Sequence, residues 1–403
     1  MNTDSRFARA SAHPTLRVND LAARKGTNAH RPWDQTAIYF TYNGRGAIYQ
    51  ILRSLPAEKG DCVLLPAFHC SSVVEAVVGA GYRAAFYRIR RDLSVDFEDL
   101  RRKLSSDVAG VLVINYCGFP ADIGPLLELR ETYGFYVLDD WAHSFLAGQS
   151  GRLTGDRADL SIYSFYKLVP SYVGGGLRIN TPALAFRPPA GSIGFKQLLV
   201  AVKALIEQVV DNSEDGVFKS AFQYAERKRV ALKHRGETAE VESAPPVAEA
   251  YVFCEDLAVA KMPWFARIIL ERSDLNEVVA ARRRNYRIVD ENLRETASIR
   301  KVFRCLPGDV CPWAYPVLLN DRSKYDHLLR TKGVPLFTFG ESLHPLVYEV
   351  GDAALEDAVY LSTNLMLIAI HQNLAASQVL TFCQTINDFF GRMGAAQLSV
   401  SAK

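Results

Sequence analysis

The sequence has few of the features that mark metal-binding, disulfide-rich, membrane or nucleic-acid-binding proteins. Its seven cysteines are scattered, and none stands in a Cys-x-x-Cys pair, which argues against a structural zinc site or a disulfide framework. No uncharged apolar run approaches the roughly 18 residues needed to cross a bilayer. The N-terminus carries Arg6 and Arg9 but lacks the apolar segment of a secretory signal. We therefore expect a cytoplasmic protein with no transmembrane segment and no metal.

Excess charge of either sign is also missing. The formal net charge is +3 over 403 residues, and no block of Lys and Arg alternates with aromatic residues, so we expect no nucleic-acid partner. What is present is an ordinary globular composition, with 49% apolar and 23% charged residues. Because 403 residues exceed one compact core, the length predicts two domains.

Apolar segments without polar alternation are separated by helical segments in the first half of the chain. This order predicts an α/β fold, with a mostly parallel central sheet covered by helices on both faces. Ligands of such sheets bind beyond the carboxyl ends of the strands. The predicted strands cover residues 62–66, 84–87, 110–115, 135–138, 161–165 and 176–180.

Changes in composition predict where the domains begin and end. Residues 1–34 are rich in Arg, Asn, Ser and Ala and are predicted to be a loose, flexible arm that could cross to a partner subunit. Residues 35–262 form the predicted large domain, in which about 182–262 are a helical insertion or lid. Residues 263–403 form a predicted small C-terminal α+β domain.

Two stretches, residues 137–145 and 161–167, gather the polar groups suited to chemistry. Lys167 follows an apolar strand, where an ammonium group is costly to bury unless it is paired or chemically modified. A Schiff base on Lys167 would remove that cost, and Asp140 would keep a pyridine nitrogen protonated, so that the ring becomes an electron sink. Strand alternation turns Asp139 the other way. The alternative is that Asp140 caps the next segment and Lys167 is a solvated loop residue.

Other arrangements of the same residues remain open at this point. A hydrolase triad of Ser164, His143 and Asp140 is conceivable, although no Gly-x-Ser-x-Gly elbow surrounds the serine. The glycine-bearing turn at residues 41–46 opens a helix that could hold a phosphate, or it is a simple turn. A metal site would need the fold to gather His69, Cys70, Cys117 and His143.

Several motifs in this order resemble the DegT/DnrJ/EryC1/StrS family of pyridoxal phosphate (PLP)-dependent aminotransferases. The similarity runs over about residues 43–390, and it implies the aspartate aminotransferase fold, fold type I. The motifs are Asn43-Gly-Arg-Gly-Ala, Leu65-Pro-Ala-Phe, Tyr116-Cys-Gly-Phe-Pro-Ala-Asp122, Leu138-Asp-Asp-Trp-Ala-His, Gly155-Asp156, Ser164-Phe-Tyr-Lys167, Gly174-Gly-Gly and Ile370-His-Gln.

The resemblance implies a role for each matching residue. Lys167 is implied to be the Schiff-base lysine, and Asp140 the partner of the pyridine nitrogen. His143 replaces a common Gln near the phenolic oxygen of the cofactor, where its protonation could tune the Schiff base. The cofactor phosphate is implied to bind at Ser164 and at the turn of Gly44, Arg45 and Gly46, and the aromatic ring that stacks on the cofactor at Phe68 or His69.

The resemblance also implies the reaction. An amino donor, expected to be glutamate, would leave its nitrogen on the cofactor for a keto substrate such as a nucleotide-linked keto-sugar. The alternatives are another PLP reaction on a non-sugar metabolite, such as dehydration, racemisation or amide formation, and a binding protein without activity. Family members are usually homodimers with shared active sites, so a dimer is expected. The family usually has Ser-Phe-x-x-x-Lys, whereas Lys167 follows Phe165 by two positions.

Overall fold

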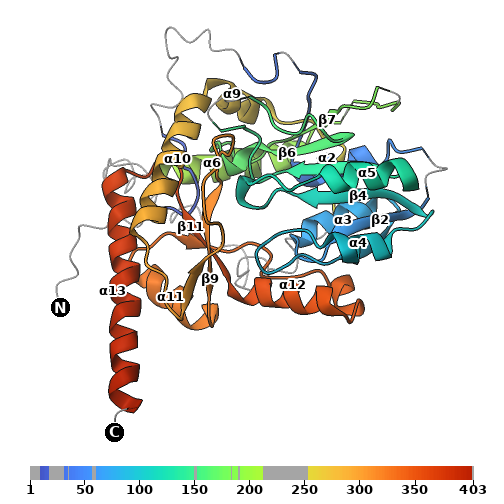
Figure 1. Ribbon diagram of the computed structural model, residues 1–403. Coiled ribbons are helices and arrows are strands. Elements are labelled where there is room, and N and C mark those ends of the chain that lie inside the picture. Colours follow the sequence, from blue (N-terminus) through green and yellow to red (C-terminus); the bar gives the residue numbers. More distant parts are fainter. Residues whose placement is uncertain are drawn as a thin grey trace, which may run out of the picture.

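The computed structural model describes residues 10–17, 31–34, 36–56, 60–148, 152–182, 184–188, 191–211 and 253–401. Most of the predicted arm, and residues 212–252 of the predicted insertion, lie outside these described residues. The described chain contains two β-sheets with helices packed around them (Figure 1). None of its helices is both long and apolar enough to cross a bilayer.

The larger sheet has seven strands and carries the first half of the chain. Five neighbouring strands are parallel, while β7 and β1 at one edge run antiparallel to their neighbours. All residues of β2, β4 and β6 are buried, as expected for strands of a parallel sheet that is covered on both faces. The predicted, mostly parallel sheet is confirmed. In spatial order the strands are β1 (Tyr39–Thr41), β7 (Gly175–Ile179), β6 (Leu160–Ser164), β5 (Tyr136–Trp141), β4 (Val108–Ile114), β2 (Cys62–Pro66) and β3 (Arg83–Tyr87).

Local capping residues set the bounds of the helices around this sheet. The side chains of Asn43 and Asp96 accept hydrogen bonds from the backbone of the first turns of α2 and α4. Gly134, with φ of 75°, ends α5 in the left-handed conformation that favours glycine. The helices are α2 (Gly44–Leu52), α3 (Ser71–Gly79), α4 (Phe97–Lys103), α5 (Gly124–Tyr133), α6 (Phe195–Asp211) and α8 (Glu255–Ala258), with short 3-10 turns η2 (Tyr116–Gly118) and η3 (Phe165–Lys167).

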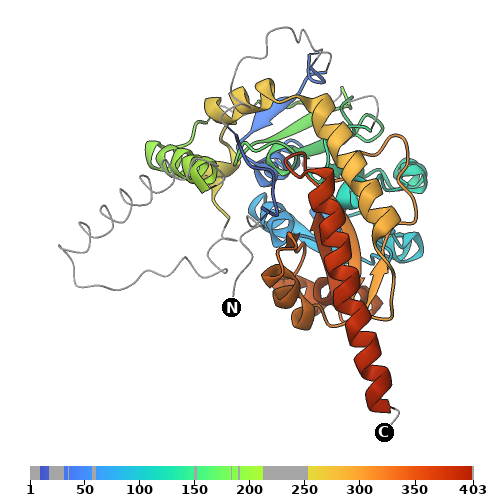
Figure 2. The same ribbon diagram turned by 90° about the vertical axis from the view of Figure 1, so that its left-hand side faces the viewer.

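The smaller sheet has four antiparallel strands from the second half of the chain. Its spatial order is β10 (Leu336–Phe337), β11 (Leu365–Ala369), β9 (Ala314–Leu319) and β8 (Ile299–Lys301). The long helices α10 and α13 lie side by side along it in both views (Figures 1 and 2). The remaining elements are α9 (Trp264–Arg272), α10 (Leu275–Asn292), α11 (Arg322–Thr331), η5 (Pro345–Glu349), α12 (Ala353–Asn364) and α13 (Ala376–Ser401).

The two sheets share one continuous apolar core. At their junction the backbone N–H of Trp313, just before β9, donates to the carbonyl of Cys117 in η2 at 2.8 Å. This bond brings the start of β9 to the carboxyl ends of β4, β5 and β6. The ends of the parallel strands therefore face the smaller sheet across a shared space.

Candidate active site

A cavity of about 470 Å³ lies where the two sheets meet. Ile114, Asp140, Ile162 and Ser164 line it from the carboxyl ends of β4, β5 and β6. The opposite wall is aromatic and comes from the smaller sheet, with Trp313 and residues 337–339. The cavity thus occupies the position in which parallel α/β sheets bind their ligands.

Lys167 lies in the cavity wall as the last residue of η3. Its Nζ lies over the ring of Trp313, at 4.6 Å from the centroid, and at 5.6 Å from that of Phe339. Burial lowers the pKa of Lys167, and the carboxylate of Asp140 opposes that shift. The lysine is therefore easier to convert to its neutral, nucleophilic form than a solvated lysine.

The neighbouring carboxylates Asp139 and Asp140 have different surroundings, as strand alternation predicts. Asp139 accepts hydrogen bonds from Asn115 Nδ2 at 2.7 Å and Trp141 Nε1 at 2.5 Å. Asp140 lines the cavity and accepts from the backbone N–H of Ala142 at 2.7 Å. Burial raises the pKa of Asp140 to about 6, against the opposing charge of Lys167. Asp140 is thus the carboxylate available to a ligand.

His143 lines the cavity in a defined protonation state. Its Nδ1 accepts a hydrogen bond from the backbone N–H of Cys117 at 3.0 Å, so in the neutral ring the proton is on Nε2. Burial, followed by the charge of Lys167, lowers the pKa of His143 well below its usual value. The sequence suggested that protonation of His143 tunes the site. The lowered pKa favours a neutral imidazole, with its proton on Nε2.

The turn that opens α2 reaches the cavity beside Ser164. Gly44 and Arg45 line the cavity, and a Cβ on Gly44 would be 3.7 Å from that of Ser164. Gly46, which was expected to share the turn, does not line it. Its N–H donates to Asn43 Oδ1 at 2.8 Å, and its Cα packs against the backbone of Ala258.

Phe68 and His69, predicted to stack on a cofactor ring, do not line the cavity. Both are fully buried. Phe68 stacks on Tyr116, with 5.7 Å between ring centroids, and His69 stacks on Phe86 at 5.4 Å. His69 Nδ1 donates a hydrogen bond to the carbonyl of Pro66 at 2.9 Å, and this bond holds the ring in the core. The neighbouring Cys70 lines the cavity in their place.

Several lining residues were missed at the sequence level. Tyr166 had a usable signal, because it stands between Ser164 and Lys167. It lines the cavity together with Ser164, Cys70 and Arg45. The others had no local signal, since tertiary packing brings them here: His13, Pro14, Ser72, Tyr172, Trp313, Phe337, Thr338 and Phe339.

Two alternatives from the sequence lack geometric support. A hydrolase triad would need Asp140 to orient the ring of His143, but His143 Nδ1 is bonded to Cys117. Within the described ranges, no group of three or more His, Cys, Asp or Glu side chains is arranged to hold a metal ion.

Comparison with known proteins finds relatives of the first half of the chain. Residues 34–185 match the family model of the DegT/DnrJ/EryC1/StrS aminotransferase family. The predicted family resemblance is confirmed. A GDP-perosamine synthase from Vibrio cholerae is 29% identical over 142 residues, which are 34% of this chain and 39% of that protein. The matched region thus spans about two fifths of this relative's length.

Solved structures extend the resemblance to the whole fold. PseC, an aminotransferase of pseudoaminic acid biosynthesis from Helicobacter pylori, has a TM-score of 0.61 at 14% identity, covering 96% of this chain and 99% of that chain. A DegT/DnrJ/EryC1/StrS aminotransferase from Brucella abortus has a TM-score of 0.59 at 16% identity, covering 87% and 85%. The predicted fold class is confirmed.

Proposed function

We propose that the protein is a PLP-dependent aminotransferase that moves an amino group from an amino acid, glutamate by preference, to a keto substrate. The observation that carries the proposal is one cavity lined by a lysine of lowered pKa, a buried aspartate and a helix-opening turn. An amine, a partner for a ring nitrogen and a phosphate cradle are the three groups that PLP needs from a protein.

Each end of the cavity suits one part of the cofactor. The backbone N–H groups of Gly44 and Arg45, with the Ser164 hydroxyl, would bind the phosphate at the positive end of α2. Asp140 would hold a proton on the ring nitrogen, since its buried charge needs a cationic partner. Once bound, PLP supplies an aldehyde that carries the amino group and a protonated ring that withdraws electrons from the substrate carbon.

Lys167 and His143 are proposed to act at the reacting end. Lys167 would hold the cofactor aldehyde through its amine and, when displaced by the amino substrate, would move the proton at the substrate α-carbon. The neutral His143 would donate from Nε2 to the phenolic oxygen, because its Nδ1 is already bonded to the Cys117 N–H. Trp313 and Phe339 beside Lys167 would exclude water from this proton transfer.

The relatives support a nucleotide-linked keto-sugar as the keto substrate. Besides the GDP-perosamine synthase, one relative is a dTDP-4-dehydro-2,3,6-trideoxy-D-glucose 4-aminotransferase from Saccharopolyspora spinosa, 25% identical over 161 residues, which are 39% of this chain and 42% of that protein. Its name specifies an aminotransferase and a nucleotide-linked dehydro-sugar. We extend that substrate class to this chain.

Borohydride trapping tests the role of Lys167 directly. Protein incubated with PLP should show the visible band of the bound cofactor, and reduction should fix the cofactor mass on the peptide that contains Lys167. Lys167→Ala should lose both signals, whereas Lys332→Ala, at an exposed lysine of the smaller domain, should keep them. An unmodified Lys167 in the wild-type protein would refute the assignment.

The donor half-reaction tests the reaction type. Glutamate should convert the bound cofactor to its amino form and release 2-oxoglutarate in a single turnover. If the cofactor is bound and no 2-oxoglutarate appears, a PLP reaction other than transamination is favoured.

We also propose a homodimer in a reducing compartment such as the cytoplasm. The free state of all seven cysteines supports the compartment. Exposed apolar side chains on α6, such as Phe195 and Leu199, support an interface with a second copy. Light scattering at several concentrations should give twice the 44.8 kDa chain mass.

A further inference from the structure

A segment from the N-terminal region, residues 10–17, borders the cavity on the side of the smaller sheet. His13 and Pro14 line the cavity, and the His13 ring lies 4.9 Å from that of Phe337. Phe337 in turn contacts Trp313, with 5.1 Å between ring centroids, and Trp313 lies against Lys167. The segment therefore extends the aromatic wall outward from the reactive lysine.

Hydrogen bonds to the turn before α13 hold this segment in place. Asn373 accepts the Thr15 N–H through Oδ1 at 3.0 Å and accepts from Arg17 through its carbonyl at 2.9 Å. The Ser11 carbonyl accepts from His371 Nε2 at 2.9 Å. Thr15 and Leu16 are buried at this contact. The segment is thus docked at three points and is not merely lying on the surface.

His371 is locked in the tautomer that this docking requires. Its Nε2 donates to Ser11, and its Nδ1 accepts from the backbone N–H of Asn373 at 3.3 Å. Burial lowers the pKa of His371 to about 3, so the ring remains neutral at ordinary pH. The motif Ile370-His-Gln, which the catalytic roles above do not use, thereby acquires a structural purpose.

The same turn is tied to the loop of the reactive lysine. Gln372 Nε2 donates to the carbonyl of Leu168, next to Lys167, at 2.8 Å. Asn285 of α10 donates to the carbonyls of Ile370 and His371 at 3.3 and 3.2 Å. The docked segment and Lys167 are therefore positioned by one rigid turn.

We propose that residues 10–17 form a specificity strap, in which His13 and Pro14 contact the keto substrate and Asn373 and His371 are positioning residues. The proposal rests on the proposed aminotransferase function. A small amino donor reacts at Lys167, whereas a larger keto substrate extends past Trp313 and Phe337 to His13. The strap therefore distinguishes the two substrates that share one cavity.

Steady-state and half-reaction kinetics of His13→Ala provide the first test. The Michaelis constant for a nucleotide-linked keto-sugar should rise about five- to tenfold, as for the loss of one hydrogen bond with its packing. The donor half-reaction with glutamate should stay within about twofold of the wild-type rate, because the donor does not reach His13. Equal losses in both half-reactions, or no loss in either, would overturn the proposal.

Two variants of one residue test the docking. Asn373→Ala removes the acceptor of the Thr15 N–H and should raise the same Michaelis constant. Asn373→Asp keeps an oxygen that can accept the Thr15 N–H, so its Michaelis constant for the keto substrate should stay near the wild-type value. Asn387→Ala removes two hydrogen bonds between the middle of α13 and the backbone at the end of α10. It is the matched control for general loss of stability and should change neither half-reaction.

A measurement without cofactor separates the strap from the aminotransferase assignment. Cys70 lines the cavity, whereas Cys254 and Cys305 are exposed and can be replaced by serine. In that background, a bulky maleimide should label Cys70 of the apo-protein faster in the Asn373→Ala variant than in Asn373→Asp or the parent. Equal rates would refute the strap even if the protein is an aminotransferase. Faster labelling would support it even if glutamate gives no reaction.

Discussion

Single residues in unusual conformations hold the candidate site together. Cys117 has a φ of 56°, in the left-handed region that a side chain rarely adopts. From this position its N–H donates to His143 Nδ1, and its carbonyl accepts from the N–H of Trp313. One strained peptide therefore sets both the tautomer of a lining histidine and the approach of the smaller sheet.

Asp140 should give the apo-protein a stability that depends on pH. Burial raises its pKa from 3.8 to about 6, so between these values the folded state binds more protons than the unfolded chain. The stability of the folded state therefore increases as the pH falls from about 6 towards 4, because the buried carboxylate becomes protonated. Above about pH 6 the carboxylate is charged, and the full free-energy cost of burying that charge applies. Asp140→Asn removes that cost and should stabilise the apo-protein at neutral pH by roughly 1–3 kcal/mol.

Urea unfolding of the apo-protein at about pH 4.5 and pH 7.5 measures this effect. Asp139, whose pKa burial also raises to about 6, remains in the variant, so the pH dependence should be reduced and not lost. Asp156→Asn, at an exposed carboxylate, is the control and should leave the profile unchanged. If the stability of the wild-type protein instead increased from acid to neutral pH, and increased equally in Asp140→Asn, the proposed effect of Asp140 would be contradicted.

At the scale of elements, the close packing of β7 on the start of α2 shapes the proposed phosphate cradle. A Cβ on Gly175 would lie 2.2 Å from the carbonyl carbon of Asn43 and 2.6 Å from the nitrogen of Gly44. These are backbone atoms, which cannot move aside as a flexible side chain can. The absence of a side chain at Gly175 is thus what lets the turn sit beside Ser164.

Gly175→Ala should therefore weaken cofactor binding more than it weakens the fold. We expect PLP affinity to fall by at least about tenfold, equivalent to about 1.4 kcal/mol, because the N–H groups of Gly44 and Arg45 are displaced. Titration of the apo-protein followed by absorbance measures this affinity. Gly308→Ala is the matched control, since a Cβ there has no atom within 4 Å. Unchanged affinity in Gly175→Ala would place the phosphate elsewhere.

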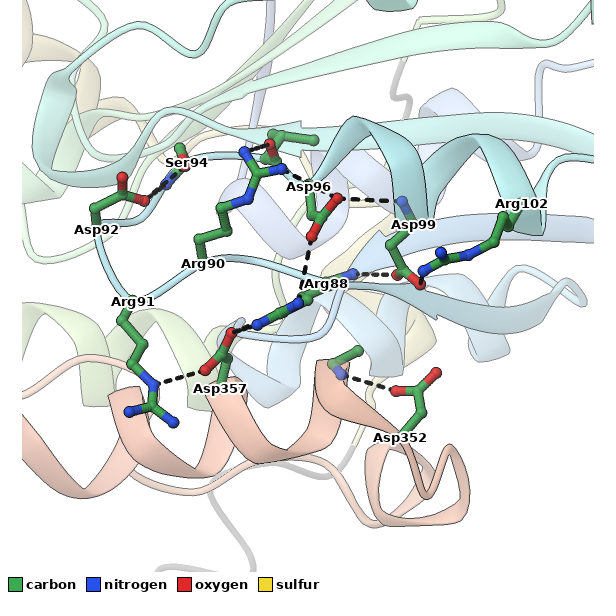
Figure 3. Close-up of polar contacts among 12 residues, drawn as sticks. Arg88, Arg90, Arg91, Asp92, Ser94, Asp96, Asp99, Arg102, Asp352 and Asp357 are labelled. Atoms are coloured by element: carbon green, nitrogen blue, oxygen red, sulfur yellow. Dashed lines mark hydrogen bonds and ion pairs between the residues drawn. The ribbon is translucent and has the colours of Figure 1, made fainter.

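A second contact between elements joins the loop after β3 to α12. Figure 3 shows Arg88 and Arg91 converging on Asp357 of α12, with nitrogen to oxygen distances of 2.7 Å for both. Arg88 also lies 3.5 Å from Asp96, the capping residue of α4. Asp357 is only 4% exposed, whereas the two arginines are 35% and 53% exposed. The network links the two sheets away from the cavity.

Asp357→Asn should destabilise the protein by about 1–3 kcal/mol, because it removes a charged acceptor that serves two donors. The exposure of the arginines limits the loss, since water can solvate them in the variant. Glu295→Gln breaks the exposed pair with Arg304 and should cost less than about 1 kcal/mol. Denaturant midpoints of both variants give the comparison, and equal shifts would show that burial of Asp357 does not matter.

At the scale of the whole molecule, the cavity is built from both sheets and from the N-terminal segment. A ligand that binds there contacts residues separated by more than 300 positions in the sequence, such as His13 and Phe339. Binding should therefore stabilise the described chain as a unit and not one domain alone. The apolar core that the two sheets share favours the same cooperative response.

PLP should raise the unfolding free energy by about 2.7 kcal/mol at a hundred times its dissociation constant. Thermal unfolding with and without PLP, followed separately by far-ultraviolet circular dichroism and tryptophan fluorescence, measures the shift. Trp141 lies in β5 of the larger sheet and Trp313 lies just before β9 of the smaller sheet, so fluorescence reports on both parts of the molecule. If ligand binding stabilises these parts as one unit, the circular dichroism and fluorescence transitions should shift by the same amount. Two separate transitions, with only one moved by PLP, would show that the domains respond independently.

Much of the architecture follows from sequence patterns because it depends on local order. Apolar runs such as residues 62–66 and 110–115 predict buried parallel strands, and the adjacent Asp139 and Asp140 predict opposite orientations on one strand. The elements that were not predicted include the strands β1, β8 and β11 and the helix α12. Strand β1 has three residues and exists through its antiparallel pairing with β7, and β11 exists between β9 and β10.

The sequence by itself determined the fold class, the family resemblance and the proximity of Lys167, Asp140, His143 and Ser164, because strand ends and short motifs place these residues locally. Only the tertiary structure decided what surrounds them. It buried Phe68 and His69 in the core and put Cys70, Trp313 and His13 at the cavity. The physical reason is that a wall between two sheets depends on packing across long separations, which no local pattern records.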